Sequence, residues 1–216
     1  MHRDTLAYLF FGVFAHSEDY LAAARALVED EYGPLDSQGV SEIFDFPDAA
    51  SYRDSMGTDL KRQFFVCRER RRQDCLASVK RDAIEMEERI TRERTAPVGR
   101  PVNIDPGLIN DCRIILASTK DYSHRLYRGD GIWEEITLMY RDGAYGSLPW
   151  TYRDFTNPGY HEFFEVFRDR VIAELCCLML LSISIARCFA ATRQSCSTLF
   201  SQTKNCLLRP VPIDAL

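Results

Sequence analysis

The chain has 216 residues, enough for one domain with a substantial hydrophobic core. Hydrophobic residues make up 46% and charged residues 27%, which is the composition of a globular protein. The formal net charge of −5 excludes a protein that binds polyanions over its whole surface, so we expect no DNA binding. Any site for a phosphate or a similar anion must therefore be a local basic patch.

Residues 5–14 are almost all apolar and predict a strand that is buried on both faces. This run has no small-residue cleavage site after it and Asp4 before it, so we interpret it as a strand and not as a signal peptide. The eight cysteines form no Cys-x-x-Cys pair and have no histidine at zinc-finger spacing, so we predict no metal site. Reduced thiols and a cytoplasmic location follow from this interpretation.

The next segment predicts a helix from Ser17 to Tyr32. Ser17 is a favourable N-cap, and two acidic residues follow it in the first turn, where the helix dipole stabilises negative charge. Gly33 and Pro34 then end the helix. We expect a short strand over residues 41–46 and a loop over residues 47–57.

A third strand is predicted over residues 60–68. It is followed by a helix over residues 72–94 with apolar residues at steps of three and four. The other face of this helix alternates acids and bases, which indicates a solvated face. We expect a turn at Asp105-Pro106-Gly107, a strand over residues 112–118, a hairpin, and a last helix over residues 160–173. The order of elements predicts an α+β fold, with helices packed on a mixed, mostly antiparallel sheet.

The end of the chain differs from the rest. Residues 175–186 form a run of twelve positions without charge, which is short for a membrane helix of roughly 20 residues, so we expect no stable membrane insertion. The run continues the last helix, associates weakly with a membrane, or begins an aberrant, out-of-frame end. We predict one folded domain over residues 1–175 and a Cys-, Ser- and Leu-rich tail over residues 176–216 that is disordered or aberrant.

The chain around Gly129-Asp130-Gly131 predicts a hairpin with a three-residue loop. In that register Tyr127 faces Trp133 and Arg125 faces Glu135, and such cross-strand pairs each stabilise a sheet by roughly 0.2–1 kcal/mol. A two-residue Asp-Gly loop would shift the register by one residue and separate Arg125 from Glu135.

Several motifs resemble a bacterial and archaeal family, the DUF4416 domain of unknown function, over about residues 9–170. The motifs that carry the resemblance are Arg100-Pro-Val-Asn-Ile-Asp-Pro-Gly107, Thr119-Lys-Asp-Tyr-Ser-His-Arg125, Gly129-Asp-Gly-Ile132 and Leu148-Pro-Trp-Thr-Tyr152. The resemblance implies no established activity. Some members are labelled as GTP-binding proteins, but this sequence has neither a phosphate-binding Gly-x-x-x-x-Gly-Lys-Ser/Thr loop nor a Rossmann Gly-x-Gly-x-x-Gly.

The segment from Thr119 to Arg125 places two cations, a histidine and an aspartate at the end of a strand, where scaffolds often present reactive groups. We therefore predict a site for a small anionic metabolite, phosphate-like or nucleotide-like, that is bound or turned over. No cofactor can be named from the sequence. The candidate catalytic residues are His124, Asp121, Asp105 and Glu135. The candidate ligand-binding residues are Lys120, Arg125, Ser123 and Arg62.

The alternative is a non-catalytic interaction or regulatory domain, in which the same residues have structural roles. Arg125 and Glu135 then only stabilise the sheet, and Asp105 only bonds its own backbone in a turn. His124, on the more apolar face of the hairpin, is then a hydrogen-bonded core histidine. The basic cluster around Arg62 is then a solvated strand end. The two hypotheses differ in geometry, since a site requires these side chains to converge on one pocket.

Overall fold

The computed structural model describes residues 6–46 and 52–191, with side chains described as far as residue 177. The chain divides into two compact units, Met1–Val171 and Ile172–Leu216. The strands are β1 (Leu6–Ala15), β2 (Leu35–Val40), β3 (Phe44–Asp45), β4 (Lys61–Arg72), β5 (Val102–Ile109), β6 (Arg113–Ser118), β7 (Leu126–Gly129), β8 (Ile132–Arg141) and β9 (Ala144–Ser147). The helices are α1 (Glu18–Tyr32), α2 (Arg53–Met56), α3 (Leu76–Glu93) and α4 (Pro158–Ala191), with short 3₁₀ turns at Gln73–Cys75 and Arg153–Thr156.

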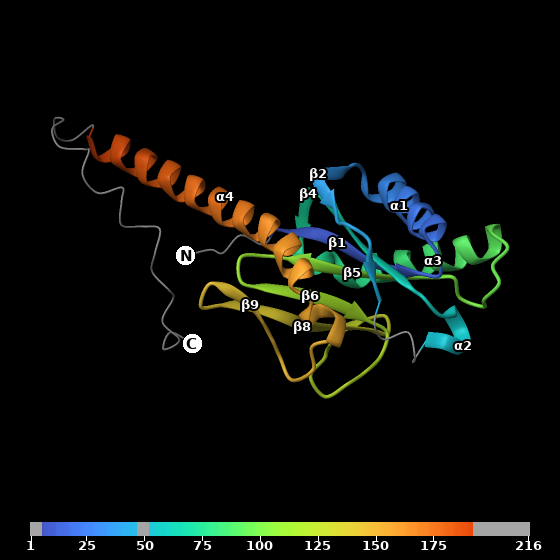
Figure 1. Cartoon of the computed structure of the whole chain (residues 1–216). Helices are drawn as coiled ribbons and strands as arrows, with labels where there is room; N and C mark the ends of the chain where they lie inside the picture. The colour runs from blue at the N-terminus through green and yellow to red at the C-terminus, as the bar shows by residue number, and fades with distance from the viewer. Residues whose placement is uncertain (1–5, 47–51, 192–216) are drawn as a thin grey trace. The chain divides into compact units, whose positions relative to one another are not determined.

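These strands form one nine-stranded sheet in the order β2-β4-β1-β5-β6-β8-β7, with β3 beside β4 and β9 beside β8. Figure 1 shows β1, β4 and β5 running through the middle of the domain. Every strand pair is antiparallel. The α+β fold predicted from the sequence is therefore confirmed, with an antiparallel sheet.

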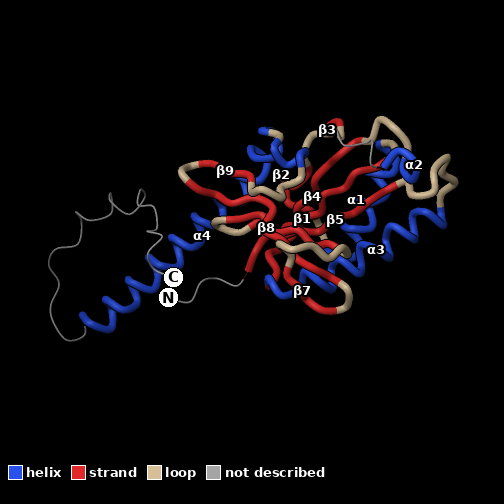
Figure 2. Tube along the Cα trace, turned by 90° about the horizontal axis from the view of Figure 1, so that it is seen from below, coloured by secondary structure: helices blue, strands red, loops and turns tan. Residues whose placement is uncertain are grey.

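The helices α1 and α3 cover one face of the sheet. Alternate residues of β1 point to this face and pack against the apolar stripes of both helices. Figure 2 shows α3 running alongside β5, and the two elements are in contact. The main contributors are Leu9, Phe11 and Val13 of β1, Leu21, Ala24 and Val28 of α1, and Leu76, Val79, Ala83 and Ile90 of α3.

The other face of the sheet carries an aromatic cluster. Phe10 and Phe64 lie on neighbouring strands, and their rings contact aromatic residues from the first turns of α4 and from the turn before it. Phe64 is fully buried, with its ring centroid 4.6–6.5 Å from those of its aromatic neighbours. Aromatic pairs at such distances contribute about 0.5–1.5 kcal/mol beyond the area they bury. The partners are Phe155, Tyr160 and Phe164.

The elements agree with most of the sequence-based expectations. The first strand and the first helix are confirmed, and Gly33 ends α1 with its N–H bonded to the Glu29 carbonyl. The short strands β2 and β9 were not predicted. Part of the expected loop over residues 47–57 is the helix α2, whereas residues 47–51 lie outside the described part of the chain.

The last helix is longer than expected, because α4 extends to Ala191 instead of residue 173. In the described residues, no helix combines the length and apolar character that a membrane crossing requires. The predicted tail falls partly on residues 192–216, which lie outside the described residues. The predicted domain boundary near residue 175 stays a prediction.

The hairpin between β7 and β8 has a two-residue loop, so the predicted three-residue loop is wrong. Asp130 and Gly131 have φ values of 53° and 74°, the left-handed conformation that such a loop requires at both positions. The predicted pairing of Tyr127 with Trp133 is nevertheless confirmed. The register shifts between Tyr127 and Gly129, so one extra residue on β7 compensates for the shorter loop.

A second correction concerns Asp105-Pro106-Gly107, which is not a turn. β5 continues through these residues and pairs with β1 along its whole length. The reason lies in Gly107, where an added Cβ would lie 2.5 Å from the Ile115 carbonyl oxygen of β6. Glycine is needed there because two strands approach closely, and not because the chain reverses.

Candidate functional site

The strands β5 and β6 separate at one end and leave a gap in the sheet. They pair only from Gly107 to Ile109, opposite Leu116 to Ile114. Pro106 stands where the pairing stops, and it has no N–H with which to extend the ladder toward β6. The first half of β5 therefore has an edge that faces away from β1 and is not covered by β6.

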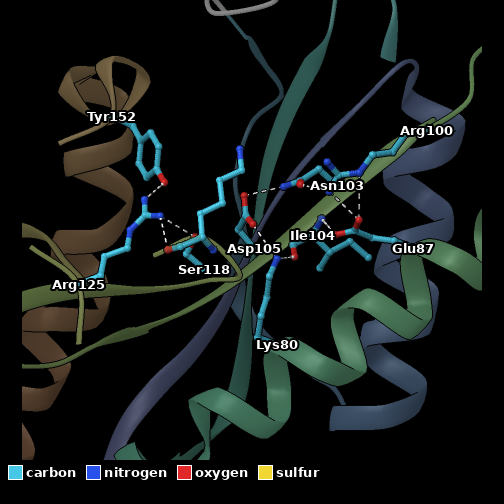
Figure 3. Close-up of polar contacts among 10 residues, drawn as sticks. Lys80, Glu87, Arg100, Asn103, Ile104, Asp105, Ser118, Arg125 and Tyr152 are labelled. Atoms are coloured by element: carbon cyan, nitrogen blue, oxygen red, sulfur yellow. Dashed lines mark hydrogen bonds and ion pairs between the residues drawn. The ribbon is translucent and has the colours of Figure 1, made fainter. Parts of the chain in front are cut away.

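Side chains of α3 occupy this open edge. The Glu87 carboxylate accepts a hydrogen bond from the Ile104 N–H at 2.8 Å, and the Lys80 ammonium donates to the Ile104 carbonyl at 2.8 Å. Figure 3 shows both side chains extending from α3 to this residue. They satisfy the two backbone groups that a neighbouring strand would otherwise pair, which explains why these charged residues are buried on a helix.

A polar network continues from this edge. Lys80 also forms an ion pair with Asp105, with a distance of 2.9 Å between Nζ and Oδ1. The Asn103 amide donates to Asp105 Oδ2 at 2.6 Å and accepts a hydrogen bond from Arg100. Arg100 completes the chain with an ion pair of 2.7 Å to Glu87. The network therefore links α3 to β5 and to the loop before it.

The pKa values of the two carboxyl groups move in opposite directions. Burial by itself would raise the pKa of Asp105, but the charges of Lys80 and Arg62 and the hydrogen bonds from Lys80 and Asn103 outweigh it, so the pKa lies below its ordinary value of 3.8. Burial raises the pKa of Glu87 above its ordinary value, against the opposing charges of Lys80 and Arg100. Asp105 is therefore an ionised acceptor at neutral pH.

The lowered pKa gives a testable pH dependence for the variant Asp105→Asn. A group whose folded-state pKa is depressed stabilises the fold above its unfolded pKa and loses that contribution as the pH falls through the folded value. We expect Asp105→Asn to cost about 1–3 kcal/mol at pH 7, and much less once the pH is below the folded-state pKa of Asp105, which itself lies under 3.8. Urea denaturation of both proteins across this range measures the difference. A cost that is equal at both ends would contradict the assigned ion pair.

The opposite wall of the gap depends on Glu135 of β8, whose side chain is 1% exposed. Its Oε2 atom accepts hydrogen bonds from Arg125 Nε at 2.7 Å and lies 2.8 Å from His124 Nε2. The predicted contact between Arg125 and Glu135 is confirmed. The prediction that His124 lies on the other face is wrong, because residues 119–125 form turns and side chains alternate only along a strand.

Arg125 also fixes the chain that follows β6. Its Nη1 donates to the Ser118 hydroxyl at 2.9 Å and to the Lys120 carbonyl at 2.8 Å, and its Nη2 donates to the Tyr152 hydroxyl at 2.6 Å. Figure 3 shows Arg125 between Ser118 and Tyr152. Arg125 therefore holds Glu135 and the chain after β6 in fixed positions beside the gap.

Arg62 of β4 is a buried cation, 3% exposed. Its guanidinium group lies within 6 Å of four ring centroids, and its charge partner is Asp154, at 3.4 Å from Nη1. In the described part of the chain, its Nε donor has no hydrogen-bond partner. The four rings are Phe14, Phe46, Phe64 and Phe155.

These groups enclose one pocket of about 140 Å³ at the gap between β5 and β6. Four of the predicted site residues line it: Arg62, Asp105, Lys120 and Glu135. His124 and Arg125 stand behind Glu135, while Asp121 and Ser123 are exposed residues of the turn that do not line it. Lining residues that sequence reasoning missed are Tyr52, Lys80, Ile84, Glu87, Arg100, Asn103, Leu116, Ala117, Ser118, Thr119, Tyr152 and Phe155.

A signal for two of the missed residues was present in the sequence. Lys80 and Glu87 are seven residues apart on α3, so they share one side of the helix, and each follows directly after an apolar stripe residue. They were assigned to the solvated face because most of their neighbours alternate in charge. In the described residues, no group of three or more His, Cys, Asp and Glu side chains is arranged to hold a metal ion.

Comparison with known families bears on this pocket. The sequence model of the family described as "Domain of unknown function (DUF4416)" matches residues 5–170. The chain belongs to the DUF4416 family. All residues that line the pocket lie inside the matched range, so the pocket is part of the DUF4416 domain. Searches among curated proteins and among solved structures found no match.

Proposed function

We propose that the DUF4416 domain binds a small anionic metabolite in the pocket between β5 and β6. The observation that carries the proposal is an excess of cationic groups with incomplete partners. Lys120 lines the pocket, and among the described residues no carboxylate forms an ion pair with its ammonium group. Arg62 lines the same pocket and holds a single long ion pair there. An anion compensates such charges more completely than water does.

The size of the pocket restricts the ligand. A volume of about 140 Å³ is well below the roughly 300–1,000 Å³ of typical sites for drug-sized molecules. A phosphate group or a small organic acid fits such a space. A nucleotide would fit only with most of its atoms outside, and the sequence offers no phosphate-binding loop for it.

Turnover of the ligand is part of the proposal and depends on Asp105. Among the lining carboxylates it is the most exposed, at 28% of its side chain, against 11% for Glu87 and 1% for Glu135. His124 and Glu135, two of the other predicted catalytic residues, are bonded to each other, and the Glu135 side chain is 1% exposed. This closed arrangement favours the second candidate, a non-catalytic domain that senses the ligand.

The proposal also includes a bacterial, cytoplasmic setting, which rests on the family resemblance. No DNA partner is proposed, since the formal net charge is −5.

Anion binding predicts stabilisation by ligand. A specific ligand at 100 times its dissociation constant should raise the free energy of unfolding by about 2.7 kcal/mol. Thermal denaturation in the presence of phosphate, sugar phosphates and small carboxylic acids measures this effect. The variant Lys120→Met should weaken it, because the ammonium group is removed while the aliphatic chain stays. Lys61→Met, at the start of β4 and outside the pocket, is the matched control.

Two outcomes would contradict binding of an anion in this pocket. If no anion raises the melting temperature of the wild-type protein, or if the Lys61 variant loses the response as fully as the Lys120 variant, the pocket is not the binding site. A ligand that binds without being consumed over hours would support the sensing alternative.

A further inference from the structure

The charge pairs in the pocket indicate how much negative charge a ligand should carry. Two of the lining cations are already compensated by lining carboxylates. Lys80 pairs with Asp105 at 2.9 Å, and Arg100 pairs with Glu87 at 2.7 Å. Because each pair is formally neutral, neither requires charge from a ligand.

Two further charges are compensated by residues behind the lining. Glu135 is paired with Arg125 at 2.7 Å, and four of the five N–H donors of the Arg125 side chain bond to the protein. Arg62 is paired with Asp154, whose side chain is 4% exposed. Although this second pair is long, it is also formally neutral.

Lys120 is then the uncompensated cation among the ionisable residues that line the pocket. Its backbone is held in place, since its N–H donates to the Ser118 hydroxyl at 3.1 Å and its carbonyl accepts from Arg125. A ligand with one negative charge makes the pocket neutral. A phosphate monoester carries about −1.5 to −2 near pH 7, and a polyphosphate carries more, so either leaves charge without a partner.

Asp105 indicates a second property of the ligand, a hydrogen-bond donor. Its two oxygens each accept one hydrogen bond, from Lys80 and from Asn103. An ionised carboxylate has about four acceptor positions, so two remain, and 28% of the side chain is exposed where it lines the pocket. A hydrogen-bond donor on the ligand fits these positions, whereas a second anionic group would be repelled.

We propose that the ligand is a small carboxylic acid with a single net negative charge and a neighbouring hydroxyl donor. Its carboxylate binds Lys120 and its donor binds Asp105. This inference rests on the proposed function, because it names the class of anion that the pocket accepts.

The experiment compares probes that differ in one property at a time, using the full chain and isothermal titration. Lactate and glycerate carry the hydroxyl donor with one net negative charge, alanine and serine carry an ammonium donor with no net charge, propionate lacks a donor, and phosphate and pyrophosphate carry more charge. We expect a hydroxy acid to bind at least tenfold more tightly than alanine, propionate and pyrophosphate. Lys120→Met should weaken that binding at least tenfold, with Lys61→Met unchanged. Asp105→Asn should bring the bound acid close to propionate in affinity.

The outcomes separate this inference from the function it rests on. Tighter binding of phosphate or pyrophosphate than of any carboxylate would overturn the inference and leave anion binding intact. Equal affinity for propionate and lactate would overturn the role of Asp105, and tighter binding of alanine than of lactate would overturn the requirement for one net negative charge. If no probe binds the wild-type protein, both proposals fail. Should Asp105→Asn not fold, the Lys120 variant still decides the case, because Lys120 is exposed.

Discussion

Replacing Glu135 with alanine should lower the free energy of unfolding by about 3–5 kcal/mol, the range for a buried ion pair that loses one partner. The Glu135 side chain is 1% exposed and that of Arg125 is 7% exposed, so water cannot replace the carboxylate. His124 and Thr137 lose an acceptor as well. Burial therefore makes this contact much larger than the roughly 0.2–1 kcal/mol of an ordinary cross-strand pair.

Urea denaturation of the purified variant measures the loss. Glu88→Ala is the matched control, because Glu88 forms an exposed ion pair with Arg92 and its removal should cost no more than about 0.5 kcal/mol. A loss below about 1 kcal/mol for Glu135→Ala would show that the ion pair between Arg125 and Glu135 does not stabilise the fold. In that case other contacts must hold the pocket-lining residues after β6 in place.

Much of the fold could be predicted because local patterns and tertiary packing agree. The apolar run of β1 is buried on both faces, and the stripes of α1 and α3 face the sheet as their periodicity indicates. The strand β2 could not be predicted, because its residues show no alternation and it pairs with β4, which is distant in the sequence. The strand β9 is short and pairs with the adjacent β8 through the Asp142-Gly143 turn, a hairpin signal that sequence reasoning missed. Their position is set by the neighbouring strands.

The site was predicted in part, and the errors have physical causes. Lys120 and Asp105 were recognised from their residue types beside strand ends and glycines, and both line the pocket. Asp105 was assigned to a turn because Pro-Gly commonly marks one, whereas here the pair allows β6 to approach and then leave β5. The contributions of Lys80 and Glu87 depend on that gap, which only the tertiary structure reveals.

Arg62 gives the sharpest test of whether a buried charge serves the fold or the ligand. The guanidinium group of Arg62 lies among four aromatic rings and beside Asp154, and both charged side chains are nearly inaccessible to water. Desolvation of such a pair is costly, and replacing both charges together is often neutral or stabilising. If Arg62 binds no ligand, its positive charge should therefore add little to the stability of the fold that an apolar residue would not also provide.

Arg62→Met should lower the free energy of unfolding by about 3–5 kcal/mol, because the buried Asp154 carboxylate then loses its ion pair with Arg62. The double variant Arg62→Met with Asp154→Asn should recover a large part of this loss, since no charge remains to be compensated. Urea denaturation of both variants and the wild type measures the stability terms, and titration with the best-bound anion measures affinity. If the double variant is stable and binds the anion as tightly as the wild type, Arg62 has only a structural role. If its stability returns while its affinity stays at least tenfold weaker, the positive charge of Arg62 is held in the core for the ligand.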